Sequence, residues 1–257
     1  DPKIHVVIEG AEFADYFWPA VEQYVECTHE YWRSNGKFTP NITLRLASGG
    51  YIGGGLYHSQ NLEGALTTLP GARIVCPSFA DDAAGLLRTS MRSKGFTLYL
   101  EPKALYNSVE AAAVVPEEFE VPFGKARIRR EGTDLTIITY GNTTHFCLDV
   151  AERLAREGVG SVEVIDLRSL IPLDKEAIFA SVRKTGKVMV VHEDKVFSGF
   201  GAEIAAQIAG EMFRYLDAPV QRVGSTFTPV GFNPILERAI LPNDEKIYKA
   251  AKELLEF

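Results

Sequence analysis

Apolar residues follow two patterns along the chain. Short runs rich in β-branched residues predict buried strands, and segments in which apolar residues recur every three or four positions predict helices. In the first half of the chain we expect strands and helices to alternate. The strands are expected at 3–8, 42–47, 72–77 and 96–102, and the helices at 19–35, 61–71 and 79–95. This alternation indicates a parallel sheet that is covered by helices on both faces.

The alternation stops in the segment 107–125, which carries two prolines and four acidic residues without a helical period. Such a composition is typical of a linker between domains. The alternation then restarts, with strands expected at 134–141, 161–174 together with an exit loop, 187–194 and 219–224, and helices at 144–158, 175–186, 200–216 and 243–257. We therefore predict two α/β domains, each with its own parallel sheet, at 1–106 and 126–257, joined by the linker 107–125.

Composition narrows the class of protein. The 257 residues carry a formal net charge of −7, which argues against a nucleic-acid-binding surface. No apolar run approaches the roughly 20 residues that a membrane span needs. The three cysteines, Cys27, Cys76 and Cys147, have no CxxC spacing. They argue against a disulfide framework or structural zinc and fit a reducing cytoplasm, where we expect them to be buried as small apolar side chains.

A glycine-rich stretch, GGYIGGG at 49–55, lies directly before Tyr57 and His58. It matches neither GxGxxG nor GxxxxGK[ST], so the nucleotide-binding fingerprints fail. Glycine permits a positive φ and a close approach of the backbone to a ligand or to another chain. Two interpretations remain open, namely a flexible surface loop and a loop that shapes a site and positions His58.

His58 taken alone is more often a structural residue than a functional one. It follows a strand and a loop, however, which is where sites lie in α/β folds, and Ser59 and Gln60 offer it hydrogen-bonding neighbours. No second histidine or cysteine lies nearby in the sequence, so we expect no metal site. Ser59 also lacks the G-x-S-x-G context of a hydrolase nucleophile.

The stretch EFADYFWPA at 12–20 is the second informative one. An acidic residue followed by several aromatic residues is unusual for the end of a core strand. The cluster either packs in the core or forms an apolar wall with polar tips for a flat ligand.

These stretches carry a family resemblance. EFADYFWPAVEQ, GGGLYHSQNLEG, PGARIVCPSFADDAAGLL and YLEPKALYN occur together in one order and spacing. They resemble the beta subunit of the thiamin-diphosphate-dependent 2-oxo acid dehydrogenases, the decarboxylating component of the pyruvate and branched-chain complexes. EVIDLRSLIPLD, KTGKVMVVHED and GFGAEIAAQI extend the resemblance over nearly the whole chain. The resemblance implies a pyrimidine-binding domain followed by a transketolase C-terminal-like domain.

The resemblance also implies roles for three residues. Tyr16 matches the family tyrosine beside the aminopyrimidine ring of the cofactor, and Glu12 stands where many members have glutamine. His58 matches the active-site histidine, which the family places near the reactive carbon of the cofactor. There it orients and protonates intermediates and helps the lipoyl group to react. The glycines would then build a close, mobile loop that brings His58 to a cofactor held between two chains.

The resemblance implies partners as well. The family's motif for the diphosphate and magnesium, GDG followed by asparagine, does not occur in the sequence. In heteromeric members this motif lies on the alpha subunit, so the chain is expected to share thiamin diphosphate with an alpha subunit that supplies the magnesium site. The expected assembly is a heterotetramer with a second beta subunit, and it acts on a lipoyl-bearing acyltransferase core.

One departure from the family concerns the glutamate that pairs with N1′ of the pyrimidine. In the family it lies on a glycine-rich segment between a strand like DPKIHVVI and a stretch like EFADY. Here Ile8 runs directly into Glu9, whose surroundings do not match that glutamate. Because a parallel crossover needs about 10–12 residues, we expect a segment to be missing after residue 8. We therefore predict that Ile8 and Glu9 are not bonded to each other.

The implied activity is the oxidative decarboxylation of pyruvate or a branched-chain 2-oxo acid, with acyl transfer to lipoyl groups. Two alternatives stay open. One is a subunit of acetoin dehydrogenase or of another transketolase-like thiamin enzyme. The other is a non-catalytic assembly subunit, which follows if the N1′ glutamate is absent from the gene.

Overall fold

The computed structural model describes residues 3–257, apart from the side chains of Ala11 and Glu12. Its strands are β1 (Val6–Phe13), β2 (Ile42–Ser48), β3 (Ala72–Val75), β4 (Phe96–Pro102), β5 (Arg127–Arg130), β6 (Leu135–Thr139), β7 (Val162–Asp166), β8 (Ser169–Ile171), β9 (Val188–Lys195) and β10 (Gln221–Ser225). Its α-helices are α1 (Val21–Arg33), α2 (Glu63–Leu66), α3 (Ala80–Arg92), α4 (Thr143–Arg156), α5 (Lys175–Thr185), α6 (Phe200–Glu211), α7 (Pro234–Ile240) and α8 (Asp244–Leu255).

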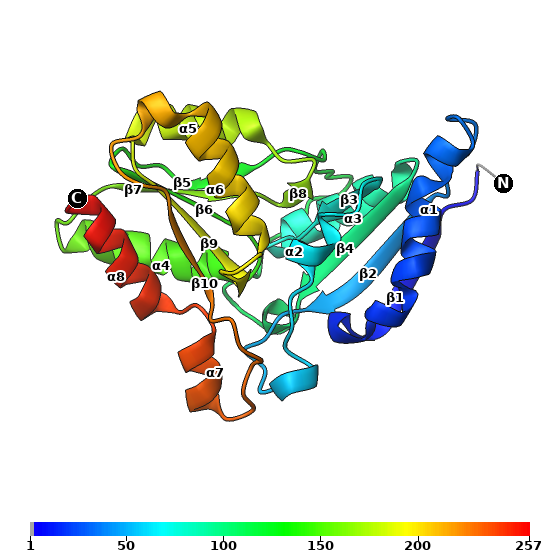
Figure 1. The fold of residues 1–257 in the computed structure, drawn as a ribbon, viewed down its shortest axis with the longest axis horizontal. Helices are drawn as coiled ribbons and strands as arrows, with labels where there is room; N and C mark the ends of the chain where they lie inside the picture. The colour runs from blue at the N-terminus through cyan, green and yellow to red at the C-terminus, as the bar shows by residue number, and fades with distance from the viewer. Residues whose placement is uncertain (1–2) are drawn as a thin grey trace.

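Within the described residues the strands form two five-stranded sheets, in the orders β1-β2-β4-β3-β8 and β10-β9-β6-β7-β5. The first sheet lies at the right of Figure 1, beside α1, and the second lies at the left, between the α5–α6 pair and the α4–α8 pair. The predicted α/β class with two sheets is confirmed. The residues 107–125 contain no helix or strand, as expected for a linker. The exact domain limits stay a prediction.

Alternate side chains of the central strands enter two different apolar cores, because successive residues of a strand point to opposite faces. On β9, Met189 and Val191 pack in the core formed with α4 and α8. Val188 and Val190 pack on the opposite face, with α5 and α6. This second core continues into the first sheet, where it includes Leu44 of β2. The two domains therefore share one apolar core and are held in a fixed relation.

The expectation that each domain has its own parallel sheet is wrong in one respect. Strand β8 comes from the second half of the chain, yet it pairs antiparallel with β3 at the edge of the first sheet, with Ile74 opposite Ile171. Strand β5 likewise adds an antiparallel edge to the second sheet. Both strands are too short to show a period of two, so the sequence analysis did not distinguish them. Helix α7, with seven residues, is likewise too short to show a clear helical period and was also missed.

The predicted chain break after Ile8 is also wrong. Ile8 and Glu9 are consecutive residues of β1, and they pair in register with Leu44 and Arg45 of β2. A register shift follows Gly10, where the strand bends toward Phe13. The crossover is supplied by α1, the helix expected at 19–35, which connects β1 to its parallel neighbour β2.

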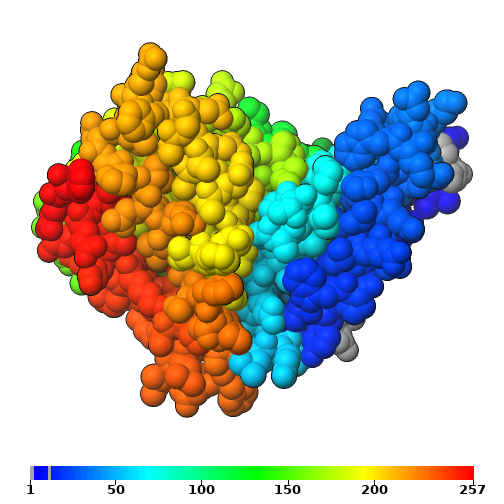
Figure 2. All heavy atoms as spheres, in the orientation of Figure 1, coloured from blue at the N-terminus to red at the C-terminus, as the bar shows by residue number. Residues whose placement is uncertain are grey.

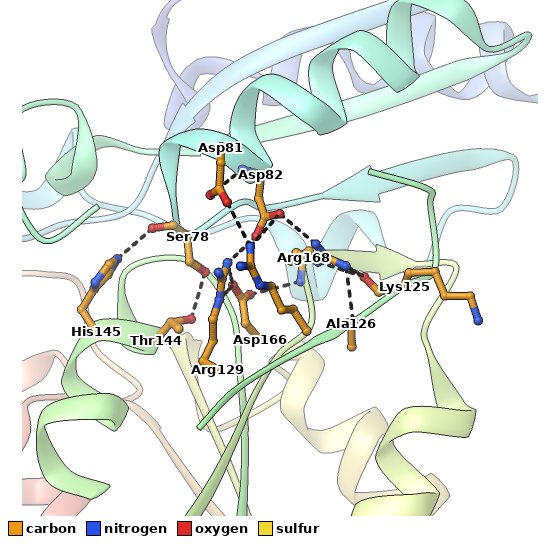
Figure 3. Close-up of polar contacts among 11 residues, drawn as sticks. Ser78, Asp81, Asp82, Lys125, Ala126, Arg129, Thr144, His145, Asp166 and Arg168 are labelled. Carbon is orange, nitrogen blue, oxygen red and sulfur yellow. Dashed lines mark hydrogen bonds and ion pairs between the residues drawn. The ribbon is translucent and has the colours of Figure 1, made fainter. Parts of the chain in front are cut away.

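A buried network of ion pairs joins the two halves on the other face of the first sheet (Figure 3). Asp82 of α3 is fully buried and contacts the guanidinium groups of Arg129 and Arg168, the latter at 2.8 Å. Arg129 also contacts Asp166 at the end of β7, at 2.8 Å. Since α3 belongs to the first half of the chain and the other three residues belong to the second, these contacts fix the orientation of the domains.

Two compositional expectations can be compared with the structure. All three cysteines are free; Cys76 and Cys147 are buried as expected, whereas Cys27 is only partly buried. No helix in the described part of the chain is long and apolar enough to cross a membrane.

Candidate active site

The glycine loop leaves the carboxyl end of β2 and passes close to the second domain. Gly49 has a φ of +88°, and a Cβ added there would lie 2.6 Å from a carboxylate oxygen of Glu193 in β9. A Cβ at Gly54 would lie 2.6 Å from the carbonyl oxygen of His58. Any larger residue at these two positions would collide with neighbouring atoms or strain the backbone. The glycines therefore serve a close approach between the loop, the second domain and His58.

Carboxylates of the second domain hold the loop by its backbone amides. The amide of Gly50 donates to Glu193, and that of Gly53 donates to Glu237 of α7 at 3.2 Å. Farther along, the amide of Gly64 donates to Asp194 at 3.0 Å. Of the two interpretations of GGYIGGG, these anchors argue against a flexible surface loop and favour a loop that shapes a site and positions His58.

His58 directly follows the 3-10 turn η3 (Gly55–Tyr57) and lies between two aromatic rings. Its ring is edge-on to that of Phe13, with centroids 4.8 Å apart, and to that of Tyr16, with centroids 5.6 Å apart. The Tyr16 hydroxyl lies 3.4 Å from Nε2 of His58. Tyr16 belongs to the 3-10 turn η1 (Ala14–Tyr16) that follows β1. The structure thus brings together the two candidate residues that lie 42 positions apart in the sequence.

The third candidate, Glu12, lies in β1, but its side chain is outside the described residues. Glu9, on the same strand, has a side chain that is 66% exposed and lies 3.8 Å from Arg45. In the described part of the chain, no group of three or more His, Cys, Asp or Glu residues could hold a metal ion.

Comparison with known proteins places the chain in a family. The model of the transketolase pyrimidine binding domain matches residues 4–109, and that of the transketolase C-terminal domain matches residues 124–247. The chain is 40% identical over 252 residues to the 2-oxoisovalerate dehydrogenase subunit beta of Bacillus subtilis (strain 168), covering 97% of this chain and 76% of that protein. It is 39% identical over 226 residues to the pyruvate dehydrogenase E1 component subunit beta of the same organism, covering 88% and 69%.

The chain belongs to the 2-oxo acid dehydrogenase beta-subunit family. Among solved structures, a split gene transketolase in an inactive beta4 tetramer matches with a TM-score of 0.74 and 21% identity, covering 97% of this chain and 75% of that one. At this identity the match supports the fold alone. The resemblance seen in the sequence motifs is therefore confirmed at the level of the family.

The beta-subunit fold also buries carboxyl groups that sequence reasoning missed. Glu63 at the start of α2 accepts a hydrogen bond from the Tyr140 hydroxyl at 3.3 Å, and its Oε2 has no hydrogen-bond partner in the described structure. Burial raises the pKa of Glu63 to about 8, and the nearby carboxyl of Asp194 adds to the rise. Burial also raises the pKa of Glu193 to about 7, although the Gly50 amide opposes the change.

These carboxyl groups had no signal in the sequence, because their neighbours come from distant segments. Glu63 is near Tyr140 and Asp194 only after the two domains have packed. The sequence VHED at 191–194 was interpreted as a strand end, and nothing in it distinguishes a buried acid from a solvated one. At neutral pH the beta subunit therefore holds at least one proton in the contact between its domains.

Proposed function

We propose that this beta subunit, together with an alpha subunit, oxidatively decarboxylates pyruvate or a branched-chain 2-oxo acid and transfers the acyl group to lipoyl groups. The contact between Tyr16 and His58, on a glycine loop that the second domain anchors, carries the proposal. Relatives named as beta subunits of such dehydrogenases, at about 40% identity over most of the chain, support it.

The side chains around His58 fit the pyrimidine half of thiamin diphosphate. Tyr16 is 47% exposed, so its ring offers a free aromatic surface to a flat heterocycle. We propose Tyr16 and Glu12 as the cofactor-binding residues of this chain. We assign the diphosphate and its magnesium ion to the alpha subunit, because the motif that holds them in the family does not occur in this sequence.

When bound, thiamin diphosphate supplies the ring that accepts electrons during decarboxylation. The part of this chain is to orient reactants and to move a proton. Nε2 of His58 is the atom that donates or accepts that proton, and the Tyr16 hydroxyl beside it fixes the direction of the imidazole. General acid–base groups of this kind contribute about 10²–10⁴-fold to a rate.

An exposed apolar surface supports the proposed association with an alpha subunit and a second beta subunit. The rings of Phe197 and Phe227 are in contact at 4.7 Å between centroids, with their planes tilted by 49°, and both are largely exposed. Phe232 and Ile235, around the start of α7, are also apolar and are 76% and 79% exposed. Figure 2 shows the segment around α7, in orange, beside the cyan segment after β2 that carries the glycine loop. Contiguous apolar surfaces of this kind mark protein interfaces.

The remaining assignments follow from the family. The lipoyl-bearing acyltransferase core is the proposed acceptor of the acyl group. A reducing cytoplasm is the proposed location, which agrees with three cysteines that are all free.

Co-purification with the alpha subunit of the source organism tests the proposal. The complex, supplied with thiamin diphosphate and magnesium, should release CO₂ from pyruvate or from 3-methyl-2-oxobutanoate and acylate lipoamide, and neither subunit alone should do so. Analytical ultracentrifugation should show association at micromolar concentration. Turnover of acetoin instead would favour the acetoin dehydrogenase alternative. A stable complex without turnover of any of these substrates would favour the assembly subunit.

A further inference from the structure

A buried charge pair lies directly beneath His58. The Lys103 side chain, just after β4, is 2% exposed, and its ammonium group donates a hydrogen bond to the carbonyl oxygen of His58 at 2.8 Å. The Asp15 side chain, in η1, is 4% exposed and lies 3.9 Å from the ammonium group. At this distance the two charges attract each other without a hydrogen bond between them.

The same pair holds both sides of one short segment. Lys103 binds the carbonyl of His58, and Asp15 accepts the amide hydrogen of Gln60 at 3.0 Å. Only the fully buried Ser59 separates these two contacts. Oppositely charged side chains hold this segment at the His58 carbonyl and at the Gln60 amide, so its backbone has little freedom to rotate. These two contacts therefore fix the position of the His58 Cα.

The pair also acts on the ring of His58 through Phe13. The Lys103 ammonium lies 4.1 Å from the centroid of the Phe13 ring, a cation–π contact. Phe13 in turn contacts the His58 ring edge-on. Lys103 therefore influences both the backbone and the imidazole of His58, although it does not touch the imidazole itself.

We propose that Asp15 and Lys103 are positioning residues, whose buried charge pair holds His58 against Phe13 and Tyr16. The importance of this position for catalysis rests on the proposed function, but the positioning itself does not. A buried ion pair is weak evidence for stability, because desolvation of the two charges offsets most of their attraction. Its contacts with the two sides of Ser59 give it a specific geometric effect.

The charge of Lys103 is sensitive to pH. Burial lowers the pKa of Lys103 to about 8, while the carboxylates of Asp15 and Glu193 oppose the change. Asp15 and Glu193 are the acids that act on the ammonium, and the His58 carbonyl accepts its hydrogen bond. Loss of the proton above this pH removes the attraction to Asp15 and the cation–π contact.

NMR of the full chain labelled with ¹³C-histidine tests the positioning directly. His58 is assigned by the signal that disappears in His58→Ala. In the wild type its ring proton signals should be displaced from those of an exposed histidine by the ring currents of Phe13 and Tyr16. In Lys103→Met at least half of this displacement should be lost. The wild-type signal should also move near pH 8, and the Lys103→Met signal should not.

A second variant guards against misfolding, since Lys103→Met leaves Asp15 buried without its counter-charge. Asp15→Asn/Lys103→Met is neutral and keeps an oxygen that can accept the Gln60 amide hydrogen. The control is Lys125→Met, because the Lys125 side chain is exposed and its ion pair with Glu176 is long, at 4.0 Å. If the folded double variant keeps the wild-type His58 signals, the positioning proposal is overturned.

The acyl-transfer assay separates this inference from the proposed function. In the complex with the alpha subunit, the double variant should lose about 10- to 100-fold in kcat, as expected for a misplaced catalytic group. If the variant displaces the His58 signals and His58→Ala keeps full activity, the positioning stands and the catalytic role of His58 fails. Unchanged His58 signals together with an inactive His58→Ala complex overturn the positioning and leave the proposed function intact.

Discussion

At the scale of single residues, two sequence motifs identified part of the candidate site, but other residues around it could not be identified from the sequence. The stretches around Tyr16 and His58 stood out because the composition of each is unusual by itself, and the family resemblance then identified the two residues. Lys103 and Asp15 lie inside motifs that were also noticed, YLEPKALYN and EFADY, yet their pairing spans most of the first domain. A single sequence contains no information on such a partnership, because neither side chain is distinctive without the other.

Two glycines of the loop provide a matched pair for testing the close approach. Gly49→Ala should destabilise the protein by about 2–4 kcal/mol, because a positive φ costs about 1–2 kcal/mol and the added methyl group collides with Glu193. Gly53 has a φ of +66°, but the space around an added Cβ is open. Gly53→Ala should therefore lose only the roughly 1–2 kcal/mol of stability that the positive φ costs. Chemical denaturation of both variants measures the difference. Equal losses would mean that the approach to Glu193 is not tight.

At the scale of elements, the long segments were predictable and the short ones were not. Strands β2, β4, β6 and β9 are short apolar-rich runs, because they are largely buried, and helices α1, α3, α4 and α8 have apolar residues every three or four positions, because one face of each is buried. Strand β8 has three residues, and it is placed by pairing with β3 across the domain boundary rather than by its own sequence. The chain break between Ile8 and Glu9 was predicted because the family pattern was given more weight than the continuity of the chain, which runs through both residues in β1.

The contact between α3 and the second domain has the buried carboxylate of Asp82 at its centre, beside the more exposed pair of Asp81 with Arg127. Asp82→Asn leaves Arg129 and Arg168 with one fewer negative partner in a buried network, which should destabilise the protein by about 3–5 kcal/mol. Denaturant unfolding, monitored by fluorescence, measures this loss. The control, Lys249→Met, removes one member of a solvent-exposed pair on α8 and should leave the midpoint unchanged. A small effect of Asp82→Asn would mean that the carboxylate of Asp82 contributes little to the domain contact.

At the scale of the whole molecule, the protons held between the domains couple stability to pH. Glu63 and Glu193 have pKa values raised to about 8 and about 7, so the folded protein keeps protons that the unfolded chain has already released. Raising the pH above the unfolded value therefore favours unfolding. Below pH 6.5 the buried His192, whose pKa is lowered to about 4, has the opposite effect because the unfolded chain binds its proton first.

Between pH 6.5 and 8 the carboxyl groups dominate, because both titrate within this window, whereas Lys103, whose pKa is lowered to about 8, opposes them only near its upper end. Across this window the free energy of unfolding should fall by about 1–3 kcal/mol as the pH rises. Glu63→Gln should flatten this slope, since the amide stays neutral at every pH, whereas Glu253→Gln on the surface of α8 should not. Urea unfolding at several pH values provides the data. A wild-type stability that rises with pH in this window would contradict the burial of protonated carboxyl groups.

The most direct test of the account compares lipoamide acylation by the alpha–beta complex for wild type, His58→Ala and His5→Ala. His5 lies before β1 and bonds to Thr43 at 2.9 Å, so it controls for the loss of a partly buried histidine outside the site. We predict that His58→Ala lowers the rate of acyl transfer by about 10²–10⁴-fold with an unchanged melting temperature, and that His5→Ala keeps the wild-type rate. A His58→Ala complex that is fully active but less stable would contradict the account and make His58 a structural residue.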